Sequence, residues 1–406
     1  MKRFIILFAV ALVSIVSLAQ KANVSKAKSF VEAEENPNYD EAKALIEAAL
    51  LDESTRGQAK TVWTAGYVYE KSAMASANTQ DWINAGIDAL KAYDNYVKAY
   101  NLDLQPDAKG KVKPVYGKKI QESMIKIYKY GLLVNYSVEM QNNQNWASAY
   151  STMDKHVSML DLPLMLVDPK VVANDTSLRK NNTYYGYVYW AGRFAYNGEM
   201  YNEVIKQFSK LKGSGYNEQA AYEFIAGAYD NLKDTANYIK TLKDGSALYP
   251  QSEYLINNLI IYYTEKNQKE EAINYLNIAI QNNPTPQLYN VLGTMYRNDD
   301  LLEKALSYFM KAVELDPDYS NANYNIGEVY YSMGEAIFEA SLKINDQNIL
   351  KAKNDERLEK YMMAVPYMEK AYEINNEDAD ATRVLKMIYY RIKLLNSKYQ
   401  PKYSIL

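Results

Sequence analysis

Small and aromatic residues recur at fixed distances in the C-terminal part of the chain. The clearest instance lies in residues 286–319. The small, aromatic and proline residues that recur there are Tyr289, Leu292, Gly293, Tyr296, Ala305, Phe309, Ala312 and Pro317. The proline recurs earlier in the chain. Pro284 lies 33 residues before Pro317, and Pro250 lies 34 residues before Pro284. A fixed period near 34 residues predicts an array of similar structural units.

This spacing resembles the tetratricopeptide repeat, a family whose unit is a pair of helices, here called helix A and helix B. The resemblance is clear over about residues 219–395 and weaker back to about residue 23. It implies an all-α fold, a right-handed α-solenoid of stacked antiparallel helix pairs. Each pair buries its apolar faces only against its neighbours.

Helix packing explains why these residue types recur at these positions. Glycine in helix A and alanine in helix B let the two helices approach closely, and the large residue one turn later fills the gap. We therefore expect Gly293 to contact Ala305, and Gly66 to lie near Ala92. Proline ends helix B because it lacks an N–H group.

The pattern divides the chain into parts of different regularity. Degenerate helical units are expected over residues 20–159, and the clearer array over residues 184–397. Between them, residues 160–183 break the pattern, either as a long irregular loop or as an extended segment in the array's own groove. Within the array we expect an inserted helical hairpin over about residues 334–363 and a closing helix over about 379–396, followed by a tail at 398–406.

The N-terminus indicates export. Residues 1–19 combine Lys2 and Arg3 with an apolar run and end in small residues, which is typical of a secretory signal peptide cleaved before Gln20. An uncleaved anchor is the alternative, and no later stretch is long enough to span a bilayer. The chain has no cysteine, which excludes disulfides and a lipid-linked N-terminal cysteine. We expect a periplasmic or outer-envelope protein of a Gram-negative bacterium.

The composition and the motifs argue against catalysis, metal binding and nucleic-acid binding. The net charge is −3, and no basic stripe with interleaved aromatics stands out, so a nucleic-acid partner is not expected. His156 is the only histidine, it occupies a helix-B alanine position, and no phosphate-binding loop or nucleophile motif is present. We therefore expect no catalytic residues, no metal and no cofactor. Thr235 lies in an Asp-Thr-Ala sequence that resembles a bacterial O-glycosylation acceptor, although Asp234 or Thr235 could simply cap a helix.

The resemblance also implies where a partner binds. In this family the second, fifth, ninth and twelfth positions of each helix A line a groove for peptides or partner helices. We call these the groove positions. On the three clearest repeats they include Tyr254, Asn257, Asn290, Thr294, Arg297, Tyr324, Glu328 and Tyr331. No lysine occupies the positions of the family's carboxylate clamp.

These observations favour a non-enzymatic scaffold that binds a protein or peptide partner. Tyr324, Glu328 and Tyr331 share one helix face, with Arg297 and Asn290 expected beside them, although the two tyrosines could instead pack against the next helix or the hairpin. The alternative is a glycan-binding protein, because the chain has 40 tyrosines, some of which could form a recognition surface rather than a core.

Overall fold

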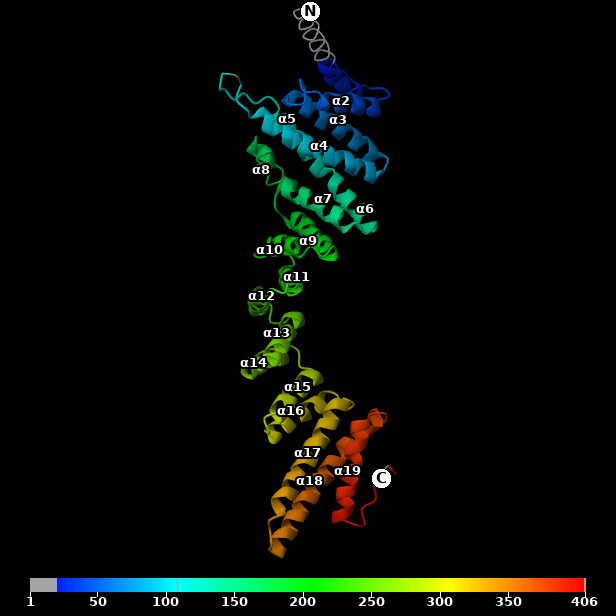
Figure 1. Cartoon of the computed structure of the whole chain (residues 1–406), viewed down its shortest axis with the longest axis vertical. Coiled ribbons are helices and arrows are strands. Elements are labelled where there is room, and N and C mark those ends of the chain that lie inside the picture. Colours follow the sequence, from blue (N-terminus) through cyan, green and yellow to red (C-terminus); the bar gives the residue numbers. More distant parts are fainter. Residues whose placement is uncertain (1–19, 108, 405–406) are drawn as a thin grey trace, which may run out of the picture. The chain divides into compact units, whose positions relative to one another are not determined.

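The computed structural model describes residues 20–107 and 109–404, and it divides into two compact units (Figure 1). The N-terminal unit ends at Tyr238, and the C-terminal unit begins at Ile239. Every regular element of these residues is helical. The expected signal peptide, residues 1–19, lies outside the described residues.

The helices of the N-terminal unit follow a helical segment at residues 20–31. They are α2 Tyr39–Leu51, α3 Ala59–Asn78, α4 Trp82–Asp103, α5 Gly117–Lys129, α6 Leu132–Asn142, α7 Trp146–Met159, α8 Pro169–Asn174, α9 Asn182–Asn197, α10 Tyr201–Ser209 and α11 Glu218–Asn231. The division between the units falls within α12, Thr235–Leu248. The C-terminal unit continues with α13 Glu253–Glu265, α14 Lys269–Asn282, α15 Pro286–Arg297, α16 Leu302–Leu315, α17 Ser320–Ser341, α18 Gln347–Ile374 and α19 Ala379–Leu395.

The same type of turn joins helix A to helix B in several of the pairs. A non-glycine residue with left-handed backbone stands in this turn six times in the described residues, at Gln80, Gln144, Glu199, Lys233, Asn267 and Asp300. In each case the next N–H group donates to a carbonyl in the last turn of the preceding helix, as from Leu301 to Tyr296. The same chain reversal therefore builds each of these pairs.

Successive pairs also stack on one another. In the C-terminal unit α14 packs on α15, α16 on α17 and α18 on α19, and in the N-terminal unit α4 packs on α6 and α7 on α9. Helix B of one pair thus covers helix A of the next. The expected all-α array of antiparallel helix pairs is confirmed.

Glycines in helix A meet a large side chain of helix B. A Cβ atom added to Gly293 would lie 2.6 Å from the ring of Phe309, and one added to Gly66 would lie 2.7 Å from the ring of Tyr96. The nearest neighbours are therefore these rings, one helical turn beyond Ala305 and Ala92. The helices approach closely at both glycines, and the nearest atoms there belong to the aromatic ring.

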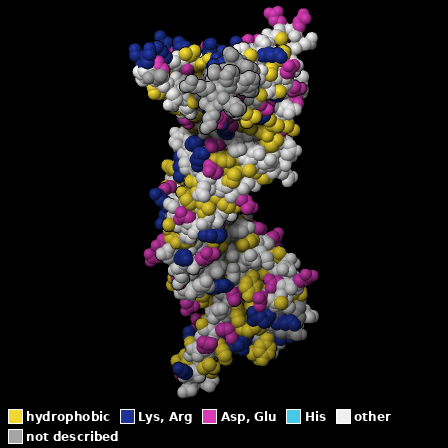
Figure 2. Space-filling model, turned by 45° about the horizontal axis from the view of Figure 1, so that its top comes forward, with side chains coloured by type: hydrophobic (Ala, Val, Ile, Leu, Met, Phe, Trp, Pro, Cys, Tyr) yellow, Lys and Arg dark blue, Asp and Glu magenta, His cyan; other side chains and the backbone are white. Residues whose placement is uncertain are grey.

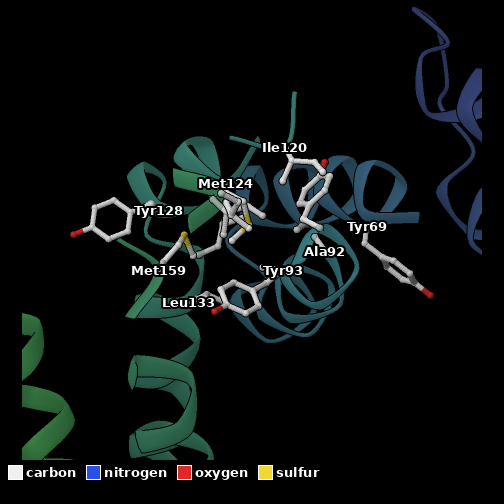
Figure 3. Close-up of a cluster of buried hydrophobic side chains, with 14 of the residues drawn as sticks. Tyr69, Ala92, Tyr93, Ile120, Met124, Tyr128, Leu133 and Met159 are labelled. Carbon is white, nitrogen blue, oxygen red and sulfur yellow. The ribbon is translucent and has the colours of Figure 1, made fainter. Parts of the chain in front are cut away.

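The segment from residue 160 to residue 183 folds into short helical turns. It contains two 3₁₀ turns, Pro163–Leu166 and Thr176–Leu178, as well as α8. The buried side chain of Gln121 on α5 donates to the carbonyls of Met165 and Asp168 and accepts from the N–H of Asp168 at 2.9 Å. Leu164, Met165 and Leu178 join the core in which Met124, Leu133 and Met159 lie together (Figure 3). This segment is thus part of the N-terminal core.

The two longest helices of the C-terminal unit, α17 and α18, occupy the interval where the inserted hairpin was expected. Gly334 on α17 faces the ring of Tyr361 on α18, and Tyr361 donates to Glu335. Arg391 of α19 binds the same carboxylate at 2.6 Å. These contacts tie α17, α18 and α19 into one core.

Many tyrosines serve such internal contacts. Among the described residues, the hydroxyl groups of seven tyrosines donate to glutamates, in the pairs Tyr67–Glu32, Tyr69–Glu47, Tyr96–Glu70, Tyr150–Glu203, Tyr361–Glu335, Tyr389–Glu369 and Tyr403–Glu373. Burial, followed by the bond to Glu203, raises the pKa of Tyr150 to about 12. A buried phenol with a carboxylate acceptor is satisfied inside the protein. This use accounts for part of the tyrosine excess without any ligand.

Candidate functional site

Four side chains on α15 and α17 form a polar network. Arg297 donates to Asn325 at 2.8 Å and forms an ion pair with Glu328, while Asn325 donates to Asn290 at 2.8 Å. The structure thus brings together Asn290, Arg297 and Glu328, which the sequence placed on neighbouring A helices. Because the charge of Arg297 is balanced by Glu328, this arginine is a poor anchor for an acidic partner.

Tyr331 and Tyr324 are less accessible than a binding role requires. Tyr331 is only 9% exposed, and its ring lies 5.8 Å from that of Tyr361 on α18. Burial is the main cause that raises its pKa. Tyr331 therefore belongs to the core and packs against the hairpin helix α18. Tyr324 is half-buried against the same core, and Thr294 donates to the carbonyl of Asn290 on its own helix at 2.9 Å.

A hollow of about 310 Å³ opens beside α13 and α15. Ile256, Leu288 and Val291 give it apolar lining, and Asn257 and Asn282 line it as well. The amide NH2 group of Asn282 donates to the carbonyls of Pro250 and Ile278. Tyr254 is exposed on the same helix as Asn257, and so is Ile261, at 55%. A mainly apolar lining with a few polar groups is typical of pockets that bind ligands.

The sequence reasoning missed the groove positions of α19. When Ala322 of α17 is aligned with Ala381 of α19, Tyr330 also aligns with Tyr389, and all four residues are buried. This register gives Asp380, Arg383, Met387 and Tyr390 as groove positions, with Tyr390 55% exposed. The repeated alanine and tyrosine were the signal that could have revealed them.

A second missed cluster lies on α9 in the N-terminal unit. Gly192 faces Phe208 as Gly293 faces Phe309, so Tyr189, Arg193 and Tyr196 fall at groove positions. The guanidinium group of Arg193 lies 5.8 Å from the ring of Trp190 and 5.7 Å from that of Phe224. Trp190 is 45% exposed, and no carboxylate among the described residues pairs with Arg193. Arginine and tryptophan are typical of binding hot spots.

His156 has no chemical partner. It is fully buried, its ring stacks on Tyr128 at 4.3 Å and meets the edge of Tyr187 at 4.8 Å, and neither ring nitrogen has a hydrogen-bond partner in the described residues. Burial lowers its pKa to about 3. Within residues 20–107 and 109–404 no cluster of acidic or histidine side chains could hold a metal ion, and none of the helices has the length and apolarity to cross a membrane.

Comparisons with known proteins agree with the repeated helix pairs. Residues 286–319 match the sequence model of the tetratricopeptide repeat. The chain is 25% identical over 166 residues to Protein bimA of Emericella nidulans, a match that covers 39% of this chain and 20% of bimA.

Two solved structures also resemble the chain. A TPR repeats protein from Bacteroides fragilis has 17% identity and a TM-score of 0.29, covering 64% of this chain and 96% of that one. The C-terminal part of a TPR repeat-containing protein from Cytophaga hutchinsonii has 15% identity and a TM-score of 0.33, covering 65% and 96%.

The matched repeat consists of α15 and α16, and the helix pairs before and after it have the same construction. Residues 286–319 thus form a tetratricopeptide repeat within this array. This fold is compatible with protein binding.

Proposed function

We propose that this protein is a non-enzymatic scaffold of the periplasm or outer envelope that binds a protein or peptide partner along the A helices of its C-terminal unit. The observation that carries the proposal is the exposure of large apolar side chains at groove positions, Ile261 on α13 and Met387 and Tyr390 on α19. A water-exposed apolar side chain gains free energy when a partner covers it. The hollow beside α13 and α15 offers a pocket for such a partner.

The structure changes which residues should be tested. Removing Tyr331 or Arg297 would disturb the core or leave Glu328 without its partner, so a loss of binding would be ambiguous. Ile261 and Tyr390 can be changed with little effect on folding because both are more than half exposed.

The double variant Ile261→Asp, Tyr390→Asp should lose the partner. Since truncation of a hot-spot residue costs more than about 1.4 kcal/mol, we expect recovery of crosslinked partners from envelope extract to fall at least about tenfold. Circular dichroism should be unchanged. The matched control is Leu315→Asp, Leu342→Asp, which introduces the same charges at exposed leucines outside the groove positions. Equal recovery with both double variants would rule out this surface.

The proposed location gives a separate prediction. If residues 1–19 are a cleaved signal peptide, protein recovered from a Gram-negative host should begin at Gln20, and its intact mass should match residues 20–406. The release of this species by osmotic shock would support the periplasmic assignment. Full-length protein in the cytosol would contradict it.

The glycan alternative has less support. It rested on the tyrosine excess, and tyrosines such as Tyr96, Tyr361 and Tyr389 are buried and donate to glutamates. These rings are not available to stack on a sugar.

A further inference from the structure

A short basic loop connects α4 to α5 in the N-terminal unit. The loop and the first turn of α5 together, residues 109–119, contain five lysines, Lys109, Lys111, Lys113, Lys118 and Lys119, and no acidic residue. In Figure 1 the loop projects beyond the ends of the helices, and Figure 2 shows basic side chains gathered at that corner of the unit.

The loop is held in a defined shape at both ends. Asp103, at the end of α4, accepts hydrogen bonds from the backbone N–H groups of Val115 at 2.8 Å and Tyr116 at 2.6 Å. Asp107 accepts from the N–H groups of Lys109 and Lys111, both at 2.9 Å. These carboxylates bind backbone groups rather than lysine side chains, so they order the loop without pairing with its ammonium groups.

The tip of the loop combines charge with apolar exposure. Val112 and Val115 are 50% and 65% exposed, and Lys109, Lys111 and Lys113 are exposed without an ion pair among the described residues. Lys118 makes one ion pair, with Asp168 at 3.5 Å, and remains 74% exposed. The ammonium group of Lys119 lies 5.4 Å from the centre of the Trp63 ring, and that of Lys28 lies 6.0 Å from the same ring. Lys119 thus continues the basic surface towards Trp63.

We propose that this loop docks the protein onto an anionic lipid bilayer, with the lysines on the phosphate headgroups and Val112 and Val115 entering the interface. Two features favour a bilayer over an acidic protein. The valines stand between lysines on a projecting segment, so clustered cations that attract anionic lipid lie beside apolar side chains that can enter the interface. The exposed ammonium groups of Lys109, Lys111 and Lys113 also suit the clustered phosphates of an anionic surface. The proposal concerns a different unit from the partner-binding surface and stands independently of it.

The test measures vesicle binding by residues 20–406, a form that retains every described core. Residues 1–19 are omitted because their apolar run would itself enter lipid. Vesicles of equal parts phosphatidylglycerol and phosphatidylcholine are compared with pure phosphatidylcholine in a sedimentation assay. We expect binding to the anionic vesicles alone, and weaker binding at high salt.

The triple variant Lys109→Gln, Lys111→Gln, Lys113→Gln should bind on the order of 100-fold more weakly, since each lysine near an anionic surface contributes roughly a fivefold gain in affinity. The matched control, Lys233→Gln, Lys343→Gln, Lys351→Gln, removes the same charge from exposed positions elsewhere and should change binding little. Val112→Ser, Val115→Ser should weaken binding without changing its dependence on salt.

Any of four results would overturn the proposal. Wild-type protein could fail to bind the anionic vesicles, or bind both kinds of vesicle equally. The control triple could lose as much affinity as the loop triple, which would make the effect one of net charge. Binding to soluble polyglutamate but not to vesicles would assign the loop to an acidic protein partner instead.

Discussion

Gly293→Leu should lower the free energy of unfolding of the C-terminal unit by about 1–3 kcal/mol, the typical cost of overpacking a well-packed core. The physical reason is the distance of 2.6 Å from an added Cβ atom to the ring of Phe309, which is itself fully buried. A leucine adds three further carbons at the same place. The ring cannot move away without disturbing the helices on either side.

A double-mutant cycle separates overpacking from other effects. Phe309→Ala alone should cost about 3–5 kcal/mol because it leaves a cavity. Combined with Gly293→Leu, it should cost less than the sum, since the leucine then enters space that the ring has vacated. Gly57→Leu is the control, because nothing lies within 4 Å of a Cβ atom added there. Strict additivity in the denaturation midpoints would show that Gly293 and Phe309 do not share this contact.

Acid should destabilise the N-terminal unit through His156. Burial lowers the pKa of this histidine from 6.5 to about 3, so between these values the unfolded chain binds a proton that the folded unit does not. The stability is therefore complete above pH 6.5 and falls as the pH decreases towards 3. Near pH 4.5, two units below the unfolded value, the loss is about 2–3 kcal/mol. The side chains that face the ring, Tyr128 and Tyr187, are neutral phenols that cannot compensate the charge.

The variant His156→Leu isolates this effect from that of the carboxylates. Asp154, for example, has a lowered pKa and also contributes to acid sensitivity, but it does so in both proteins. Urea denaturation near pH 7 and near pH 4.5 should therefore show a loss for the wild type that exceeds the loss for the variant by about 2–3 kcal/mol. Equal losses would mean that His156 is protonated in the folded unit or reaches solvent there.

The fold could be predicted because its requirements are local. Gly293, Phe309 and Pro317 each satisfy a need of a single helix pair, namely close approach, filling and termination, so their spacing shows in the sequence. The course of residues 160–183 could not be predicted in this way. It depends on Gln121, a polar residue on a different helix, whose amide happens to satisfy Met165 and Asp168.

The candidate site could be predicted only as a set of positions. The repeat register placed Arg297 near Glu328, but it could not show that the two pair with each other and with Asn325. It also gave Tyr331 a place on the groove face, whereas the lengthened α18 covers that ring. Groove positions counted from the repeat pattern hold only where all repeats have the same length. The inserted hairpin lengthens α17 and α18, so the counted positions fail there. The same reasoning stopped before α19, where Tyr390 is exposed.

The helix α19 also bears on self-association. Its alignment with α17 sets Lys386 in place of Gly327 and Lys393 in place of Gly334, the two glycines whose added Cβ atoms would lie 2.8 Å from Met368 and 2.4 Å from Tyr361. A helix B that approached α19 as closely as α18 approaches α17 would meet two ammonium groups and would have to strip them of water. Copies of this chain that tried to join end to end at this face, and so to grow into fibres, would meet the same barrier. The two exposed lysines therefore oppose the packing of a further helix pair on this face of α19.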